Sequence, residues 1–429
     1  MLYEDYDIII IGGGPAGLAA AIATGRRKTL LVEREERLGG ILKQCIHDGF
    51  GLLRFGERLS GPEYAHRFIT ELGKTAVKVK LQTFVSKIER TAEGGFRLLL
   101  TNRDGMESVT AKAVILATGC RERTARQAAI HGARPAGVLT AGAAQYYVNI
   151  MGQLPGKRCV ILGSGDIGLI MARRLTLEGT DVLGVFEAKQ TPSGLSRNIV
   201  QCLNDFNIPL HVSKTVTRVF GDARVEAVET ASVDRDMRPI AGTEETIACD
   251  CLILSVGLIP ENELAESLGV SLNPATKGPF VDQHSMTMLP GLFSCGNALH
   301  VNDLVDYVSE SGEEAGKTAA AFVLHPSAYS RSFVDIFPHF FPTADILCVT
   351  PQCIDLNHLD EKTALFFRVR EERGKTTVSI RREPPAESGA DGEEVFRKTY
   401  RRLRPPEMEK ITLDLRCLQE GEKVTISIL

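Results

Sequence analysis

The stretch DIIIIGGGPAGLAAAIA, residues 7–23, indicates the fold of the whole chain. Four consecutive isoleucines predict a strand that is buried on both faces, and the alanine-rich run after Gly17 predicts a helix. Between them, Gly12, Gly14 and Gly17 form the pattern G-x-G-x-x-G. Gly12 permits a tight turn, Gly14 lets a pyrophosphate approach the backbone, and Gly17 lets the helix pack closely on the strand.

The start of this predicted helix suits a phosphate group. Pro15 fits a first helical turn because its missing N–H would have no partner there. The free N–H groups and the positive end of the helix dipole attract phosphates. The next predicted strand, residues 29–33, ends in Glu33, about 20 residues after Gly12, where a carboxylate that binds a ribose is expected. Together these features predict a bound dinucleotide.

The same pattern recurs later in the chain. The stretch CVILGSGDIG, residues 159–168, places Gly163, Gly165 and Gly168 in a second G-x-G-x-x-G, again followed by a predicted helix. The next predicted strand, residues 181–187, also ends in an acid, Glu187. This internal duplication predicts a second dinucleotide.

Composition excludes several other classes. The chain has 429 residues, 43% of them hydrophobic, and a net charge of −4, so it has no basic excess for nucleic acid. The apolar stretch 6–25 follows acidic residues and contains glycines, which argues against a signal peptide or a membrane span. We therefore expect a cytoplasmic protein without an integral membrane segment.

Ten cysteines occur without a C-x-x-C motif, so we expect no redox dithiol and no ferredoxin-type cluster. Core packing explains the neighbouring Cys249 and Cys251 better than metal binding does, and we predict no metal site.

The remaining segments predict the following elements. Ser60 and Glu63 predict a capping box at the start of a helix that ends near Leu72. Segments 77–84, 96–101 and 108–111 predict the strands of a small antiparallel meander. Residues 113–119 predict a further buried strand, and residues 303–322 predict a later helix.

Composition changes after Pro326. Aromatic residues and prolines cluster at 333–342, and a loose loop is predicted at 384–392, with Pro384, Pro385, Gly389 and Gly392. We predict an all-β region without a chemical motif, for packing or for contact with a partner. Its strand-like runs are 345–349, 363–370, 376–381, 394–401, 410–414 and 424–429.

These motifs together resemble the flavoproteins with two dinucleotide-binding domains, over about residues 5–325. The two glycine turns carry the resemblance, together with the strand endings at 117–119 and 257–260 and the segment 295–297. The resemblance implies an α/β fold with two Rossmann-like dinucleotide-binding domains, for FAD and NAD, and a C-terminal all-β extension. The implied boundaries are 1–125 and 261–325 for the FAD-binding domain, 126–260 for the NAD-binding domain and 326–429 for the β domain.

Segments 38–47, 120–123 and 297–306 look like one branch of that superfamily. This branch holds FAD/NAD(P)-dependent oxidoreductases found beside glycerol-3-phosphate dehydrogenase-like flavoproteins. Its relatives include opine oxidase and hydrogen cyanide synthase subunits.

The resemblance implies that hydride passes between a nicotinamide nucleotide and FAD. For the first unit and the late segment the implied cofactor-binding residues are Gly12, Gly14, Pro15, Ala16, Gly17, Glu33, Arg34, Gly40, Ile41, Val85, Ala117, Thr118, Gly119, Gly296, Asn297, Leu304 and Val305. For the second unit they are Gly163, Gly165, Asp166, Ile167, Glu187 and Gly257.

This sequence departs from the family pattern at several places, among them Ile170, which stands where the reductases have a glutamate near the nicotinamide. Asn297 stands where an aspartate is usual, so it can bond a ribityl hydroxyl but carries no charge. Only Cys45 stands in the region where disulfide reductases have a dithiol, which argues against a disulfide substrate. Glu187, with no arginine beside it, favours NAD over NADP.

Catalytic residues stay open at this stage. By analogy with the reductases, Cys45 and His47 are candidates that face the flavin; the alternative is that Cys45 packs and His47 hydrogen-bonds locally. His300 could contact the flavin or a substrate, or form a hydrogen bond at the start of the following helix.

We therefore predict a nicotinamide-linked FAD oxidoreductase that serves as the electron-transfer subunit of a glycerol-3-phosphate-dehydrogenase-like system. One alternative is a self-sufficient NADH oxidase or acceptor reductase. Another is a scaffold subunit that nucleotides merely stabilise. The expected partners are a nicotinamide nucleotide and a dehydrogenase subunit, with homo- or hetero-oligomers both open.

Overall fold

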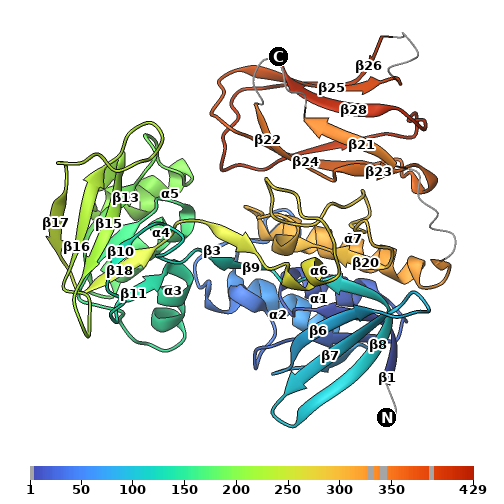
Figure 1. Ribbon diagram of the computed structural model, residues 1–429, viewed down its shortest axis with the longest axis horizontal. Coiled ribbons are helices and arrows are strands. Elements are labelled where there is room, and N and C mark those ends of the chain that lie inside the picture. The colour runs from blue at the N-terminus through green and yellow to red at the C-terminus, as the bar shows by residue number, and fades with distance from the viewer. Residues whose placement is uncertain (1–3, 327–332, 339–344, 386–390) are drawn as a thin grey trace. The chain divides into compact units, whose positions relative to one another are not determined.

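The computed structural model describes residues 4–326, 333–338, 345–385 and 391–429. Contacts within the chain divide it into two units (Figure 1). The first unit contains Met1–Lys43, His47–Cys120 and Pro260–Leu429, and the second contains Gln44–Ile46 and Arg121–Ile259. In sequence, the second unit is thus an insertion into the first.

The first unit contains a seven-stranded sheet. Its strands are β1 (Glu4–Ile11), β2 (Thr29–Val32), β5 (Lys78–Lys80), β6 (Phe84–Arg90), β7 (Phe96–Asn102), β8 (Gly105–Leu116) and β20 (Leu292–Ser294). Their order is β5-β2-β1-β8-β7-β6, and β20 also pairs with β8. β5, β2, β1, β8 and β20 pair in parallel, whereas β6, β7 and β8 are antiparallel.

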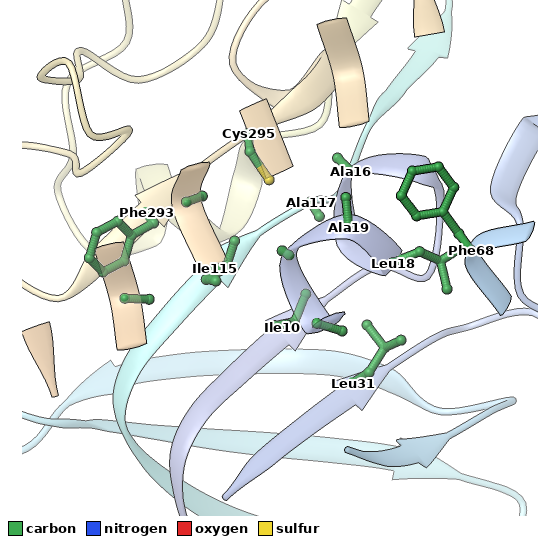
Figure 2. Packing of buried hydrophobic residues seen from close by; sticks show 14 of the residues in the cluster. Ile10, Ala16, Leu18, Ala19, Leu31, Phe68, Ile115, Ala117, Phe293 and Cys295 are labelled. Atoms are coloured by element: carbon green, nitrogen blue, oxygen red, sulfur yellow. The ribbon is translucent and has the colours of Figure 1, made fainter. Parts of the chain in front are cut away.

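Both faces of β1 are buried, as its sequence predicts. Ile8 and Ile10 pack in one hydrophobic cluster with helices α1 (Pro15–Ala23), α2 (Gly61–Leu72) and α7 (Val305–Phe322). Ile9 and Ile11 pack in a second cluster with strands β6 and β7 and helix α6 (Glu263–Ser267). Figure 2 shows the first of these clusters, in which Ile10, Leu31 and Ile115 of the sheet lie below the alanine-rich helix α1.

Helices α1 and α7 approach each other very closely. A Cβ added at Gly312 would lie 2.1 Å from the carbonyl oxygen of Ala16, and one at Gly316 would lie 2.3 Å from that of Ala20. The late helix is therefore seated on the first helix through backbone contacts that a side chain would prevent.

The capping box at the start of α2 is confirmed: Glu63 N donates to Ser60 Oγ, and Ser60 N donates to Glu63 Oε2. Two predictions for the neighbouring strands are wrong. Residues 108–111 and 113–116 belong to the single strand β8, because buried and less buried side chains alternate through Lys112 without a break, and residues 117–119 follow the strand. Residues 77–84 do not form one strand of the meander, since β5 pairs in parallel with β2.

The second unit contains a five-stranded parallel sheet in the order β11-β18-β12-β13-β14. The predicted repeat of strand, glycine turn, helix and strand is confirmed as β12, α4 and β13. A four-stranded sheet has the order β10-β15-β16-β17. The elements are β10 (His131–Gly132), β11 (Val138–Thr140), α3 (Ala141–Asn149), β12 (Arg158–Leu162), α4 (Asp166–Leu177), β13 (Asp181–Glu187), α5 (Ser196–Cys202), β14 (Leu210–Val212), β15 (Lys214–Phe220), β16 (Ala227–Ser232), β17 (Glu245–Ala248) and β18 (Cys251–Leu254).

The described residues from 333 onward form two sheets, β23-β21-β28-β25-β26 and β22-β24-β27. The strands are β21 (Phe333–Pro338), β22 (Ile346–Thr350), β23 (Cys353–Asp355), β24 (Thr363–Val369), β25 (Thr376–Glu383), β26 (Glu393–Tyr400), β27 (Glu409–Leu413) and β28 (Lys423–Ile428). Strands β21 and β23 were not predicted from the sequence. Residues 339–342 of the aromatic cluster and Gly389 of the predicted loop lie outside the described residues.

Short elements complete the chain. They are η1 (Gly40–Gln44), β3 (Asp48–Phe50), β4 (Leu59–Ser60), β9 (Cys120–Glu122), η2 (Asn204–Phe206), β19 (Leu258–Pro260), η3 (Gly296–Ala298) and η5 (Leu356–His358). Strand β9 pairs with β19, so the two segments that connect the units form a short ribbon.

Candidate functional site

The turn between β1 and α1 is fixed by two of its three glycines. Gly12 has a φ of +107°, and a Cβ there would lie 2.3 Å from the carbonyl oxygen of Ala117. A Cβ on Gly17 would lie 1.8 Å from the carbonyl oxygen of Gly12. At Gly14, in contrast, the nearest atom to an added Cβ is Gly40 Cα at 3.9 Å. The packing of the chain thus requires glycine at 12 and 17, whereas an open face at 14 is what a bound pyrophosphate would need.

The turn between β12 and α4 repeats this distribution. Gly163 has a φ of +101°, and its added Cβ would lie 2.0 Å from the carbonyl oxygen of Ser255. A Cβ on Gly168 would lie 2.4 Å from the carbonyl oxygen of Gly163. The middle glycine, Gly165, is again open, with Ser255 Oγ at 3.7 Å.

Both helices that follow these turns begin at a glycine. The N-cap residues are Gly14 for α1 and Gly165 for α4, so neither has a side chain to bond the first N–H groups. Pro15 occupies the first turn of α1. In α4 the first residue is Asp166, whose Oδ1 accepts hydrogen bonds from Leu195 N (2.8 Å) and Asn198 Nδ2 (2.7 Å). Ile167 follows it and packs partly buried against the core of the second unit.

The two predicted acids occupy equivalent positions. Glu33 directly follows β2 and Glu187 ends β13, the strand after the glycine turn and helix in each case, and both residues are 6% exposed. Glu33 Oε2 accepts a hydrogen bond from Gly13 N at 2.6 Å. Glu187 Oε2 accepts hydrogen bonds from Ser164 N at 3.1 Å and Ser164 Oγ at 2.5 Å. Each carboxylate is therefore held against the backbone of its own glycine turn, where the ribose of a bound dinucleotide is expected.

Ser164 also belongs to this arrangement, although it was not predicted from the sequence. Its Oγ accepts a hydrogen bond from Ser193 N at 2.9 Å, and Ser193 Oγ donates to Glu187 Oε2 at 3.1 Å. The sequence did contain a sign of this role: Ser164 lies between Gly163 and Gly165, so its hydroxyl must lie at the turn.

The late segment contacts the first turn. Gly296 has a φ of +61°, and its added Cβ would lie 2.8 Å from the Cβ of Ala16. Its N–H donates to Ser311 Oγ on α7 at 2.8 Å. Leu304, the N-cap residue of α7, is 40% exposed, and Val305 is the first helical residue. This helix begins two residues after the predicted start.

Asn297 is engaged within its own loop. Its Oδ1 accepts hydrogen bonds from Asn302 N at 3.0 Å and Asn302 Nδ2 at 3.3 Å. Its Nδ2 lies 3.6 Å from Cys120 Sγ. The amide therefore orders the loop that leads into α7.

Glu261 joins the predicted residues at the end of β8, although its sequence context gave no sign of this. Its carbonyl oxygen accepts a hydrogen bond from Thr118 Oγ1 at 2.6 Å, and its N–H donates to the carbonyl oxygen of Gly119 at 3.0 Å. Its carboxylate pairs with Arg34 Nη1 at 3.1 Å. Thr118 and Glu261 are 143 residues apart, so no local pattern could reveal the contact.

Ala117 continues from β8, and its N–H donates to the carbonyl oxygen of Ile11 at 2.9 Å. Val85 is 4% exposed and its side chain packs in the core of the first unit, so only its backbone is available to a cofactor. Just before it, Thr83 N donates to the carbonyl oxygen of Glu33 at 3.0 Å. In the second unit, Gly257 is exposed, and its carbonyl oxygen accepts a hydrogen bond from Arg123 N at 3.0 Å.

Gly40 and Ile41 begin the short helix η1. An added Cβ on Gly40 would lie 3.0 Å from Gly14 Cα, and Ile41 is 58% exposed. Gly40 therefore lies beside the open glycine of the first turn.

The two candidate catalytic residues have different surroundings. Cys45 belongs to the second unit, where burial raises the pKa of its thiol to about 12 and its Sγ lies 3.7 Å from Gln145 Oε1. At neutral pH this thiol is protonated and is a poor nucleophile. His47 belongs to the first unit and contacts the ring of Phe50. These contacts agree with packing, and a catalytic role for either residue stays a prediction.

His300 is buried beside the start of α7. Burial, together with the charge of Arg368, lowers the pKa of this imidazole to about 4. Its ring centroid lies 5.8 Å from that of Phe366. Within the described part of the chain, its Nδ1 has no hydrogen-bond partner. The ring is therefore neutral at pH 7. Phe366 of the C-terminal strand β24 packs against it.

The family comparison agrees with this geometry. The family model for pyridine nucleotide-disulphide oxidoreductases matches residues 6–318, which include both glycine turns, both acids and most of α7. The chain belongs to this family. It is accordingly an oxidoreductase that uses FAD and a pyridine nucleotide.

This oxidoreductase is similar to several curated proteins. It is 28% identical to hydrogen cyanide synthase subunit HcnB of Pseudomonas protegens, over 63% of this chain and 60% of that protein. It is 24% identical to an opine oxidase subunit of Agrobacterium tumefaciens, over 75% of this chain and 66% of that protein. It is 25% identical to ferredoxin–NADP reductase of Lactiplantibacillus plantarum, over 78% of this chain and 95% of that protein. The chain thus spans less than two thirds of the first two relatives.

Solved structures show the same fold. Thioredoxin reductase of T. acidophilum has a TM-score of 0.63 at 23% identity, over 75% of this chain and 99% of that one. Thioredoxin reductase of Lactococcus lactis has a TM-score of 0.62 at 24% identity, with the same coverage. The predicted resemblance to opine oxidase and hydrogen cyanide synthase subunits is confirmed, and the predicted link to glycerol-3-phosphate dehydrogenase stays a prediction.

The residues of the oxidoreductase fit both cofactors. Each unit offers an open middle glycine, a helix that begins without a side-chain cap, and a buried carboxylate against the turn.

Among the helices that the structure describes, none combines the length and the apolar character needed to cross a membrane.

Proposed function

We propose that this oxidoreductase transfers hydride between NAD(H) and FAD as the nicotinamide-linked subunit of a larger dehydrogenase. The observation that carries the proposal is the repeated glycine turn, once in each unit, with a buried carboxylate against it. In this assignment residues 1–125 and 261–325 bind FAD, residues 126–260 bind the nicotinamide nucleotide, and residues 326–429 contact a partner.

The residues of the first unit would hold FAD as follows. Gly12, Gly14 and Gly17 leave room for the pyrophosphate beside the first turn of α1, and Glu33 accepts hydrogen bonds from the ribose. The N-terminus of α7, at Leu304 and Val305, directs its positive end to the flavin ring. Bound FAD supplies a ring that accepts hydride from reduced nicotinamide.

The carboxylate of Glu187 supports a preference for NAD over NADP. It is buried against the second turn, and a ribose 2′-hydroxyl can donate a hydrogen bond to it. A 2′-phosphate at the same place would meet a like charge and lose solvent.

The proposed role in a multi-subunit enzyme is supported by the printed names of two relatives, which are subunits of hydrogen cyanide synthase and opine oxidase. Glycerol 3-phosphate, or a similar small substrate, is proposed from the sequence resemblance alone. The acceptor-reductase alternative is favoured by the ferredoxin–NADP reductase relative, because the match covers 95% of that protein.

Anaerobic titration of the purified chain with NADH and with NADPH, followed by flavin absorbance, tests the proposal. We expect stoichiometric bleaching by NADH at lower concentration than by NADPH, and slow turnover with oxygen, ferredoxin or a quinone. Rapid turnover with one of these acceptors would favour the self-contained reductase. If neither NADH nor NADPH reduces the flavin, the result would favour the alternative of a scaffold subunit that nucleotides merely stabilise.

A further inference from the structure

A cluster of one imidazole and two carboxylates lies away from both glycine turns. His284 is in a tight turn of the first unit, where its N–H and that of Met286 both donate to Asp282 Oδ1. Glu314 lies on α7, and Asp360 lies in the loop after η5. Ligand atoms of His284, Glu314 and Asp360 all lie within 4.8 Å of one another.

The distances suit a small divalent cation. His284 Nδ1 lies 3.3 Å from Glu314 Oε1 and 3.7 Å from Asp360 Oδ2. In a tetrahedral zinc site with bonds of about 2.0–2.1 Å, neighbouring ligand atoms are about 3.3 Å apart. The three side chains could therefore surround one cation after small movements of the exposed Asp360.

A second observation concerns the other nitrogen of the ring. His284 Nε2 lies 2.7 Å from the carbonyl oxygen of His358, and a carbonyl can only accept, so Nε2 carries the hydrogen. Metal-binding histidines commonly donate their other N–H in this way, which fixes the orientation of the ring. The same carbonyl also accepts a hydrogen bond from Gln283 Nε2 at 3.1 Å, and Thr318 Oγ1 donates to Glu314 Oε1 at 3.3 Å. The ring and one carboxylate are thus both held by surrounding groups.

The charges point the same way. The Nδ1 of His284 faces the carboxylates of Glu314 and Asp360, and a divalent cation between the three side chains would neutralise the negative charge of the two carboxylates. His284 is buried, with 11% of its side chain exposed, whereas 61% of the Asp360 side chain is exposed and gives a cation access. A mixed set of imidazole and carboxylate ligands suits zinc better than calcium or magnesium.

We propose that His284, Glu314 and Asp360 bind one divalent cation of the zinc type, with water in the fourth position. The bound cation would tie helix α7 to the loop after η5. The proposal does not depend on the identity of the electron acceptor. The three residues are far apart in sequence, so the spacing of histidines and acids along the chain could not predict the site.

Zinc binding to the flavoprotein tests this proposal, with Asp360→Asn as the variant and Glu361→Gln as the matched control. Both positions are exposed neighbours, so neither substitution removes a buried group. All proteins carry Cys417→Ser, because Cys417 is the exposed cysteine and would bind zinc on its own.

We expect one equivalent of zinc by calorimetry in the control and at least a tenfold weaker affinity in Asp360→Asn. At a hundredfold excess over Kd, zinc should raise the apparent Tm of the control by about 3–5 °C. Absence of saturable binding would overturn the proposal and leave an ion pair of His284 with the carboxylates. Equal binding by Asp360→Asn and Glu361→Gln would also overturn it.

Discussion

The two glycine turns share one backbone plan but differ in what closes over them. In both, the outer glycines are required by the chain and the middle glycine is open. The first turn is backed by α7, a helix that comes about 290 residues later in the sequence. The second turn is closed locally, by Ser193 and the segment bonded to Asp166. The glycine pattern thus specifies the backbone of the turn, whereas different segments of the chain cover the turn in each unit.

The largest expected effect breaks the turn itself. Gly17→Ala places a Cβ 1.8 Å from the carbonyl oxygen of Gly12, so the free energy of unfolding should fall by about 4 kcal/mol or more. Gly25→Ala is the control, because Gly25 has a φ of +62° but no atom within 4 Å of an added Cβ. Denaturant unfolding measures both, and equal stabilities would contradict the packing argument.

The second prediction uses pH to separate the two units. The pKa of His300 in the first unit is lowered from 6.5 to about 4. Between these two pH values the imidazole is protonated in the unfolded chain and neutral in the folded chain. Stability should therefore fall as pH drops from about 6.5 to about 4, by on the order of 3 kcal/mol, and should be unaffected by this group above that range.

Chemical unfolding across this pH range measures the slope. His300→Gln should flatten it, whereas His131→Gln, at an exposed histidine of the second unit, should leave it unchanged. If the His131 variant lost the slope instead, the burial of His300 would not be its cause.

A smaller effect is expected from a mirrored pair of acids. Glu187→Gln removes a charged acceptor worth about 1.5–3 kcal/mol, so the Kd for NADH should rise at least tenfold while flavin content stays the same. Glu33→Gln should do the reverse and lower the flavin content of the purified protein. Titration of NADH and extraction of flavin distinguish the two; a loss of both cofactors in either variant would contradict the assignment.

The smallest effect concerns the open glycines. Gly14→Ala and Gly165→Ala meet nothing closer than 3.9 and 3.7 Å, so the free protein should keep its stability within about 1 kcal/mol. Gly14→Ala should still weaken flavin binding at least tenfold, and Gly165→Ala should weaken NADH binding to the same extent, which is about 1.4 kcal/mol each. Unchanged cofactor affinity would mean that the pyrophosphates lie elsewhere.

Local patterns predicted much of the fold. The isoleucines of β1, the capping box of α2 and the second glycine turn could be recognised because each depends on residues close in sequence. The prediction of two strands in place of β8 was wrong because the exposed Lys112 continues the alternation of that strand. Strands β21 and β23 were missed, since they are strands only because distant partners pair with them.

The candidate site shows the same limit. Glycines and acids carry local signatures, so Glu33 and Glu187 were predictable. The contact of Glu261 with Thr118, and the burial of His300 against Phe366, arise from segments far apart in sequence. The setting of Cys45 depends on Gln145, a hundred residues away, and sequence could not supply it.

The seating of α7 on α1 has a consequence for biosynthesis. In the first unit, β8 pairs with β20 and α1 packs against Gly312 and Gly316, which are synthesised much later. The second unit, in contrast, lies almost entirely in the continuous segment Arg121–Ile259. Because domains fold as they leave the ribosome, we expect the second unit to be complete while the first unit still exposes its unfinished core to chaperones.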